Sequence, residues 1–310
     1  MARIGRFKDD EARAAYLRAY DAVADLWPMP ATDVDVPTSF GTTRVRSSGD
    51  GAGSPFVLLH GFGGTGPTWH ACVPTLAAAR RVYAPDTIGA AGRSVQTAPL
   101  RGDADIARWL EEVLDGLGAD RVHLVGESQG AWHAALVAVH APARVASVSL
   151  VEPNGVFART PLSALSRMLR LGARPSEDAW SRMHEWLTPG VQLEDELLEL
   201  ARAAQGYRTG LGWARPLKDS AIRRIDVPLL AIYGGASVLS DPSRAVRRLA
   251  ELAPTAEVEV YPGRGHGVLG EIRDEVLARV VDFAGRHDRV EEVPPPARPV
   301  LPTQPSCDRR

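Results

Sequence analysis

Residues 122–140 read VHLVGESQGAWHAALVAVH, and they join a short apolar strand pattern to an alanine-rich helical pattern across the motif Gly-x-Ser-x-Gly. A turn this tight brings neighbouring backbone segments into contact, so Gly126 and Gly130 are needed where any side chain would collide. The turn holds Ser128 in a strained conformation with its hydroxyl presented at the edge of a sheet. The start of the following helix adds partial positive charge at that point. The stretch therefore predicts that Ser128 is a nucleophile, rather than part of a merely structural turn.

Short apolar runs recur on both sides of this stretch, and most of them are separated by helix-like segments rich in alanine. Near-continuous apolar strands that alternate with helices indicate a parallel sheet covered on both faces. The sequence therefore predicts an α/β fold. The further runs are residues 56–59, 82–84, 145–151, 229–233 and 258–261.

The alternation breaks between the fourth and fifth parallel strands, where helical stretches carry tryptophan and methionine but no strand signal is present. Binding crevices in such sheets form at the strand ends, so we expect this insertion to be a helical cap above them. Its large apolar side chains are Met168, Trp180, Met183, Trp186 and Trp213. The expected parts are an N-terminal helix packed on the core (1–30), the core (31–153 and 225–287), the cap (154–224) and a Pro-rich disordered tail (288–310).

A serine hydroxyl becomes an effective nucleophile only when a base takes its proton. The predicted base is His266, in the glycine-rich loop Pro-Gly-Arg-Gly-His-Gly that directly follows the last predicted strand. A histidine in a loop is ordinarily a surface residue, but this one comes late in the chain order of serine, acid and histidine. Four other histidines have weaker claims, because they lie in a His-Gly turn, in the helix after the serine or near the tail: His60, His133, His140 and His287.

The oxyanion that forms when a serine attacks a carbonyl group needs two fixed N–H donors. One is expected to be the backbone N–H of Gln129, directly after the serine. The second is expected to be the N–H of Phe62, in the glycine-rich loop 60–64 after the first central strand. The alternative is that this loop is simply flexible.

Taken together, these pieces resemble the α/β-hydrolase superfamily, and most closely its bacterial carboxylesterase-type members. The resemblance implies an α/β-hydrolase fold with a mostly parallel central sheet and helices on both faces, and the expected helical cap and Pro-rich tail fall outside the matching segments. It also implies acyl-ester chemistry that requires no cofactor. The matching segments are Trp27-Pro28, residues 36–43, residues 58–61, residues 86–94, the Ser128 turn and the His266 loop.

The sequence departs from the superfamily at the acid that orients the histidine. Relatives usually carry an aspartate or glutamate shortly after the strand that here ends at 233–234, and that position holds Ser237. Glu152 at the end of an earlier central strand is the first substitute, and some superfamily members place their acid there. Asp241 is the second, although Asp-Pro before a helix first indicates an N-cap. The remaining alternatives are that Glu152 is a polar residue closing a strand and that no acid is present.

Composition excludes several classes of function. The net charge of −2 argues against a nucleic-acid partner. Cys72 and Cys307 form neither a disulfide framework nor a zinc pattern, so we expect a reducing compartment and no metal. The glycine-rich residues 61–66 lack the lysine of a phosphate-binding loop, so no cofactor is expected. Without a signal-peptide pattern or an apolar run long enough for a bilayer, we expect a cytoplasmic protein and no membrane partner.

Three functions remain open at this point. The first is a serine hydrolase that cleaves a small, fairly apolar carboxylic ester through an acyl-enzyme on Ser128, with a small molecule as its partner. The second keeps the fold but is a lyase or cyclase of bacterial secondary metabolism, in which His266 removes a proton and no acyl-enzyme forms. The third is a catalytically inactive, ligand-binding protein, which the serine at position 237 favours.

Overall fold

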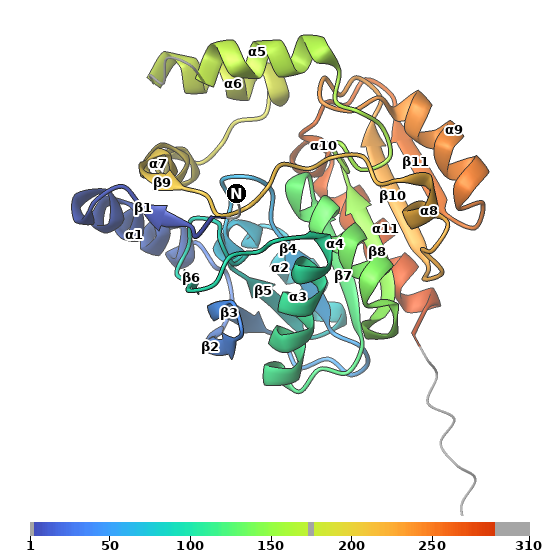
Figure 1. Ribbon diagram of the computed structural model, residues 1–310, viewed down its shortest axis with the longest axis horizontal. Coiled ribbons are helices and arrows are strands. Elements are labelled where there is room, and N and C mark those ends of the chain that lie inside the picture. The colour runs from blue at the N-terminus through green and yellow to red at the C-terminus, as the bar shows by residue number, and fades with distance from the viewer. Residues whose placement is uncertain (1–2, 173–176, 289–310) are drawn as a thin grey trace, which may run out of the picture.

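A computed structural model describes residues 3–172 and 177–288 of the chain. Its centre is a nine-stranded sheet in the order β11-β10-β8-β7-β4-β5-β3-β2, with the short β6 paired to β3 (Figure 1). All six apolar runs predicted as strands belong to this sheet, and the pairs between them are parallel. They are β4 (Phe56–Leu59), β5 (Val82–Pro85), β7 (Val122–Glu127), β8 (Val145–Val151), β10 (Leu229–Gly234) and β11 (Glu257–Tyr261). The antiparallel part consists of β2 (Thr32–Thr38), β3 (Gly41–Ser48) and β6 (Val95–Gln96).

Helices cover both faces of the sheet, and the alternation of side chains along β4 shows how. Val57 and Leu59 join one apolar core, while Phe56 and Leu58 join the other, as the two-residue period of a strand requires. The first core is closed by α3 (Asp103–Leu117), α4 (Gln129–His140) and α9 (Pro242–Leu252). The second is closed by α2 (Val73–Ala79) and α11 (Arg273–Arg286). Two buried faces explain why these strands have continuous rather than alternating hydrophobicity.

The N-terminal helix α1 (Asp10–Asp25) begins at Asp9, whose carboxylate accepts a hydrogen bond of 2.7 Å from the Ala12 N–H. It packs on α7 (Asp195–Ala203) as well as on η1 (Gly66–Trp69) of the core. Ahead of it, β1 (Arg6–Phe7) pairs with β9 (Tyr207–Arg208) in a separate two-stranded sheet. The expectation that residues 154–224 contain no strand was therefore wrong, because a two-residue strand is too short to show a periodic pattern.

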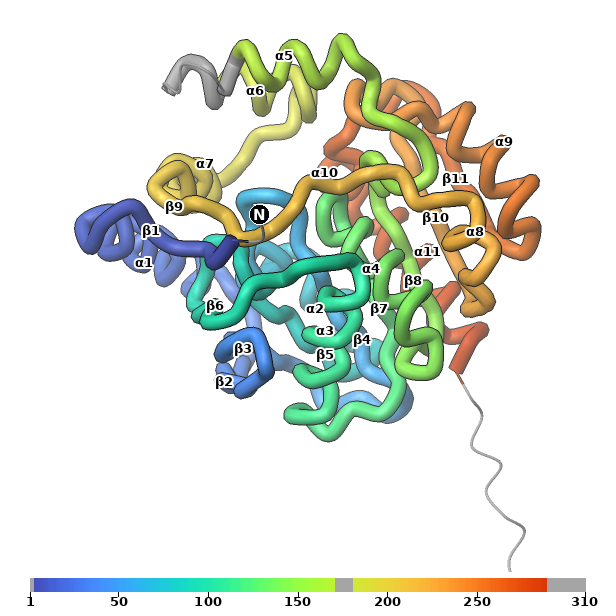
Figure 2. Tube along the Cα trace, viewed as in Figure 1, coloured from blue at the N-terminus to red at the C-terminus, as the bar shows by residue number. Residues whose placement is uncertain are grey.

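The described part of residues 154–224 also contains helices that rise beside the carboxyl ends of the strands, with α5 packed on α6 (Figure 1). The tube in Figure 2 shows the segment after β9 returning across the molecule to α8. We call residues 209–217 of this segment the strap. The remaining elements are α5 (Leu162–Gly172), α6 (Glu177–Leu187), η3 (Ala204–Gly206), α8 (Asp219–Ile222), η2 (Pro142–Arg144) and α10 (Val268–Glu271).

The predicted boundary of the tail needs a small correction. Asp288 belongs to the described part of the chain, where its carboxylate accepts a 2.9 Å hydrogen bond from His123 and pairs with Arg80. The rest of the predicted disordered segment, residues 289–310, lies outside the described residues. Within residues 3–172 and 177–288, no helix has the length and apolar character needed to cross a bilayer.

Candidate active site

Ser128 occupies the turn between β7 and α4 in a backbone conformation that residues other than glycine rarely adopt, with φ 50° and ψ −111°. A Cβ on Gly126 would overlap the backbone of Gly130 and Ala131, and one on Gly130 would overlap the carbonyl of Leu59. Both glycines are thus required by close backbone approach, as the sequence predicts. The turn leaves the Ser128 hydroxyl free to face the loop that carries His266.

His266 lies with Nε2 at 3.1 Å from the Ser128 hydroxyl oxygen. Its loop is held against the end of β10, because a Cβ on Gly234 would overlap the backbone carbonyls of Arg264 and Gly265. The Gly265 N–H also donates to the carboxylate of Glu271 at 2.9 Å, which fixes the residue directly before the histidine. A glycine-rich loop thus brings a residue 138 positions from the serine into hydrogen-bond distance.

Glu152 lies on the other side of the imidazole, with Oε2 at 2.9 Å from His266 Nδ1. The side chain is fully buried, and three further donors bind it. Oε1 accepts the Gly234 N–H at 2.6 Å, and Oε2 accepts the hydroxyl groups of Ser237 at 2.7 Å and Ser240 at 3.0 Å. A buried carboxylate needs such partners, because a buried polar group without hydrogen bonds is costly.

The strand order explains why Glu152 reaches the histidine. β8 and β10 are neighbours in the sheet, with Val151 opposite Ile232, so Glu152 emerges beside the end of β10. That is the point after which relatives were expected to carry their acid. Ser237, at the expected acid position, donates to Glu152. Asp241 instead caps α9, accepting a 3.0 Å hydrogen bond from the Arg244 N–H. The structure brings Glu152, and not Asp241, to His266.

Backbone strain is concentrated at this site. Among the described residues, Ser128 and Glu152 are the non-glycine residues with positive φ, at 50° and 47°. Such conformations cost on the order of 1–3 kcal/mol each and persist only where the surrounding structure enforces them. The surroundings here include the Ser128 N–H bound to Val151 O at 3.0 Å and the Glu152 N–H bound to Ile232 O at 2.8 Å. Two strained residues hydrogen-bonded to one histidine indicate a functional site.

The two predicted oxyanion donors belong to segments that adjoin the serine, the loop after β4 and the first turn of α4. The position of a Cβ on Gly61, next to Phe62, is 3.5 Å from the Ser128 Cβ, so this loop contacts the serine. Gln129 is the first residue of α4, where a backbone N–H has no acceptor within its own helix. Both N–H groups are therefore suited to bind an anion beside Ser128.

The side chain of Gln129 has a second role, which the sequence did not indicate. Its Nε2 donates to Gly212 O at 3.1 Å, and its Oε1 accepts the Ala214 N–H at 3.1 Å, so it binds the strap on both sides of Trp213. Nε2 also lies 3.4 Å from His133 Nε2. Burial lowers the pKa of His133 to about 3, so this ring is neutral and accepts the bond. The two contacts of Gln129 with the strap join residues more than 80 positions apart, and no local pattern predicts them.

The remaining carboxylate at the site is Glu127, which directly precedes the serine. Burial raises the pKa of Glu127, the charge of His266 lowers it and the charge of Glu152 raises it, with a net upward shift. His60, a weaker candidate for the base, is buried, and its Nε2 accepts the Thr87 N–H at 3.1 Å. Its Nδ1 lies 2.9 Å from the Gly61 carbonyl oxygen, so both ring nitrogens have partners, which favours the structural role that the His-Gly turn indicates. Burial lowers the pKa of His60.

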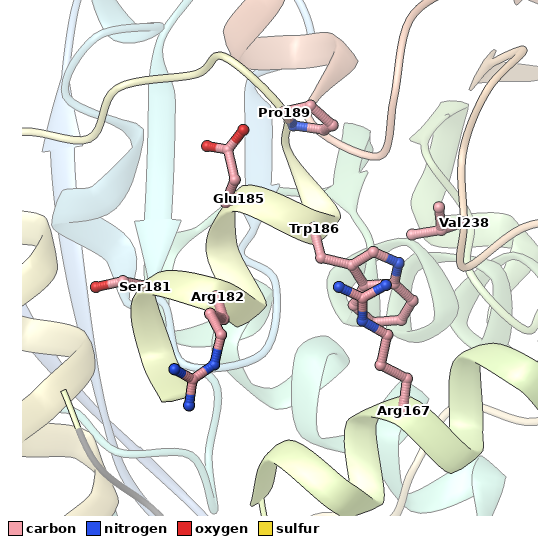
Figure 3. A pocket seen from close by; sticks show the side chains of 7 residues that line it. All are labelled: Arg167, Ser181, Arg182, Glu185, Trp186, Pro189 and Val238. Atoms are coloured by element: carbon pink, nitrogen blue, oxygen red, sulfur yellow. The ribbon is translucent and has the colours of Figure 1, made fainter. Parts of the chain in front are cut away.

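A cavity lies outside this constellation, between α5, α6 and the loop after β10. It has a volume of 610 Å³ and approaches the site through Val238, the neighbour of Ser237. Figure 3 shows Arg167 lying across the ring of Trp186, with its guanidinium carbon 4.8 Å from the ring centroid. Since neither Ser128 nor His266 lines it, the cavity by itself does not mark the catalytic position.

A parallel sheet with a strained serine at a strand–helix turn, a histidine after the last strand and a helical insertion is the arrangement of α/β hydrolases. A family model described as alpha/beta hydrolase fold matches residues 54–271, and the chain belongs to this family and is an enzyme. The sequence-based assignment of fold and superfamily is confirmed.

Carboxylesterases are among its relatives. The carboxylesterase YbfK of Bacillus subtilis (strain 168) is 27% identical over 290 residues, which cover 90% of this chain and 96% of that protein. The crystal structure of carboxylesterase CesB (YbfK) from Bacillus subtilis superposes with a TM-score of 0.82 at 26% identity, covering 88% of this chain and 98% of the other. The naproxen esterase (carboxylesterase NP) of Bacillus subtilis gives a TM-score of 0.81 at 26% identity, with 88% and 98% covered.

Proposed function

We propose that the protein is a serine carboxylesterase that cleaves a small, fairly apolar ester through an acyl-enzyme on Ser128. The observation that carries the proposal is the chain of hydrogen bonds from Ser128 to His266 (3.1 Å) and from His266 to Glu152 (2.9 Å). Nucleophile, base and orienting group in hydrogen-bond distance are what covalent acyl transfer requires. The carboxylesterase relatives support the same class of reaction.

In the first half of the reaction, His266 Nε2 takes the hydroxyl proton as Ser128 Oγ attacks the carbonyl carbon of the ester. The carbonyl oxygen becomes an oxyanion, to which the N–H groups of Phe62 and Gln129 donate. As the tetrahedral intermediate collapses, the C–O bond to the alcohol breaks and His266 returns its proton to the leaving alkoxide. The products of this half are the free alcohol and an acyl group bound to Ser128.

In the second half, water gives a proton to His266 Nε2 and attacks the acyl carbon, and the same N–H groups bind the new oxyanion. Collapse releases the carboxylic acid and returns the proton to Ser128. In both halves Glu152 accepts the Nδ1–H of His266, which keeps Nε2 unprotonated in the resting ring and stabilises the imidazolium that forms. No step requires a cofactor or metal.

The orientation of Glu152 bears on the alternative of an inactive binding protein. That alternative was favoured by a serine at position 237, where relatives carry their acid. Ser237 donates its hydroxyl to Glu152 instead, so the serine supports an acid supplied by the neighbouring strand. The preference for a small, fairly apolar substrate rests on the apolar residues of the segment 154–224. The cytoplasmic location remains a prediction.

The experiment that tests the proposal is the reaction of wild type and Ser128→Ala with p-nitrophenyl acetate, followed by acid quenching and intact-mass analysis. We expect wild type to release p-nitrophenol and to carry one added acetyl group, and Ser128→Ala to show neither. Turnover of this ester without an acyl-enzyme would contradict the covalent mechanism. A folded wild type that neither turns over nor acylates would instead favour the lyase, cyclase or binding alternatives.

A further inference from the structure

Two exposed aromatic side chains, one from the glycine-rich loop after β4 and one from the strap, stack on each other. Phe62 is 59% exposed and Trp213 is 61% exposed, and their ring centroids lie 4.8 Å apart with an interplanar angle of 30°. Every other phenylalanine and tryptophan side chain placed within the described part of the chain is buried or half-buried. Single exposed apolar residues are ordinary, whereas large apolar side chains exposed together mark binding surfaces.

Both rings are tied to the immediate neighbours of Ser128. Phe62 follows Gly61, at which a Cβ would lie 3.5 Å from the Ser128 Cβ. Trp213 is held by Gln129, the next residue after the serine, through the backbone hydrogen bonds of Gly212 and Ala214. The aromatic pair is therefore carried by two segments that are each fixed to a neighbour of the serine, the loop of Gly61 and the segment bound by Gln129.

The strap that carries Trp213 is fixed rather than free. The Gln129 side chain is only 7% exposed, and its two amide hydrogens and its oxygen all have partners, with neutral His133 and Gly212 O as acceptors and the Ala214 N–H as donor. The strap is also held at Leu217, whose N–H donates to Val156 O at 2.9 Å. Because the backbone is fixed on both sides of Trp213, this segment loses little conformational entropy when a ligand binds to the ring.

We propose that Phe62 and Trp213 form a subsite for a flat aromatic ring in the acyl or alcohol part of the ester. This inference rests on the proposed function, because it assigns part of the substrate that Ser128 cleaves. The exposed faces and edges of the two rings offer offset-stacked and edge-to-face contacts, which only another aromatic ring can complete. A saturated ring of the same size would gain burial alone.

The test measures binding without turnover, by calorimetric titration of the Ser128→Ala protein with two matched pairs of esters. One pair is methyl phenylacetate and methyl cyclohexylacetate, and the other is benzyl acetate and cyclohexylmethyl acetate. The ester with the cyclohexyl group is the more apolar member of each pair, so burial of apolar surface alone would favour binding of the saturated ester. We expect the aromatic ester of at least one pair to bind about two- to tenfold more tightly than its partner.

Three variants in the Ser128→Ala background locate the preference. Trp213→Leu keeps an apolar side chain but removes the ring, and we expect the aromatic preference to be lost. Trp213→Phe should restore part of it. Val95→Ala, which shortens another exposed apolar residue (57%), should leave the preference as it was.

A preference for the saturated ester in both pairs, or equal binding, would overturn the subsite. So would an aromatic preference that persists in a folded Trp213→Leu protein. If wild type hydrolyses none of the four esters while the Ser128→Ala protein retains a Trp213-dependent aromatic preference, the proposed function fails and the subsite remains. The two proposals are therefore separable.

Discussion

Replacing Glu152 with glutamine removes the charge of the proposed acid while keeping its size. The carboxylate now accepts four hydrogen bonds, three at Oε2 (from His266, Ser237 and Ser240) and one at Oε1 (from Gly234). A glutamine amide has one oxygen, and its NH₂ group donates. One of the two positions must therefore place donor against donor in a fully buried setting.

Both orientations of the amide harm the site. With its nitrogen at the Oε1 position, the amide faces the Gly234 N–H, where the present distance is 2.6 Å. With its nitrogen at the Oε2 position, it faces His266 Nδ1, which must then accept, and the ring proton moves to Nε2 and prevents it from taking the Ser128 proton. Either way the imidazolium loses its counter-charge. We expect kcat to fall about 10³- to 10⁴-fold, ~4–5.5 kcal/mol in activation free energy, as for the corresponding change in a serine protease.

The assay is steady-state hydrolysis of p-nitrophenyl acetate, with thermal unfolding by circular dichroism to show that the variant is folded. Asp241→Asn is the matched control, because it removes the other candidate carboxylate while asparagine still caps α9. We expect Asp241→Asn to retain the wild-type kcat. The reasoning is refuted if folded Glu152→Gln keeps kcat within tenfold of wild type, or if Asp241→Asn loses as much as Glu152→Gln.

Three further predictions concern the neighbours of the site. In a Glu152→Ala background, Ser237→Asp should raise kcat at least about tenfold, because Ser237 and the imidazole bind the same oxygen of Glu152. If kcat does not rise in the same esterase assay, position 237 is not close enough to His266 to supply the acid. Gly130→Ala should destabilise the protein by at least ~2 kcal/mol in chemical denaturation, since its Cβ would overlap the Leu59 carbonyl, and an unchanged midpoint would contradict that close approach. Burial raises the pKa of Glu127. The folded chain therefore binds more protons than the unfolded chain between about pH 4.3 and the raised pKa. As a result, the free energy of unfolding should fall as the pH rises through that interval. Glu127→Gln should flatten this dependence, as measured by denaturation across pH, and an identical slope in both proteins would exclude the assignment.

The fold could be predicted because its signals are local. The inner parallel strands are buried on both faces, so a run such as 56–59 is continuously apolar in the sequence. The strained turn at Ser128 needs glycine on both sides for steric reasons, and that requirement is visible within five residues. The same holds for the glycine-rich loop that carries His266.

The acid and the hydrogen bonds of the strap could not be predicted with the same certainty, because both depend on contacts between segments that are far apart in the sequence. Whether Glu152 or Asp241 approaches His266 is decided by the pairing of β8 with β10, which places the ends of these strands side by side. The bonds of the Gln129 side chain to the strap likewise span more than 80 residues. Asp288 was assigned to the Pro-rich tail, and its partners His123 and Arg80 lie more than 160 positions away, where no local pattern indicates them.

The chain contains a second serine–histidine–carboxylate set, which gives the central claim an internal control. His123 Nδ1 lies 2.8 Å from the Ser147 hydroxyl and its Nε2 lies 2.9 Å from Asp288, so the hydrogen-bond distances resemble those at Ser128. Ser147 and His123 are each only 1% exposed, and Ser147 is not among the described residues with positive φ. We therefore expect access and the strained turn, rather than the distances alone, to decide which serine reacts.

The measurement that tests the account most directly is labelling with a fluorophosphonate, read by intact mass and by peptide mapping of the modified serine. The account predicts one label on wild type, located on Ser128, absent from Ser128→Ala and formed much more slowly in His266→Ala. Ser147→Ala should label as wild type does. Failure of folded wild type to react, or a label that survives in Ser128→Ala, would contradict the claim that Ser128 is the activated nucleophile.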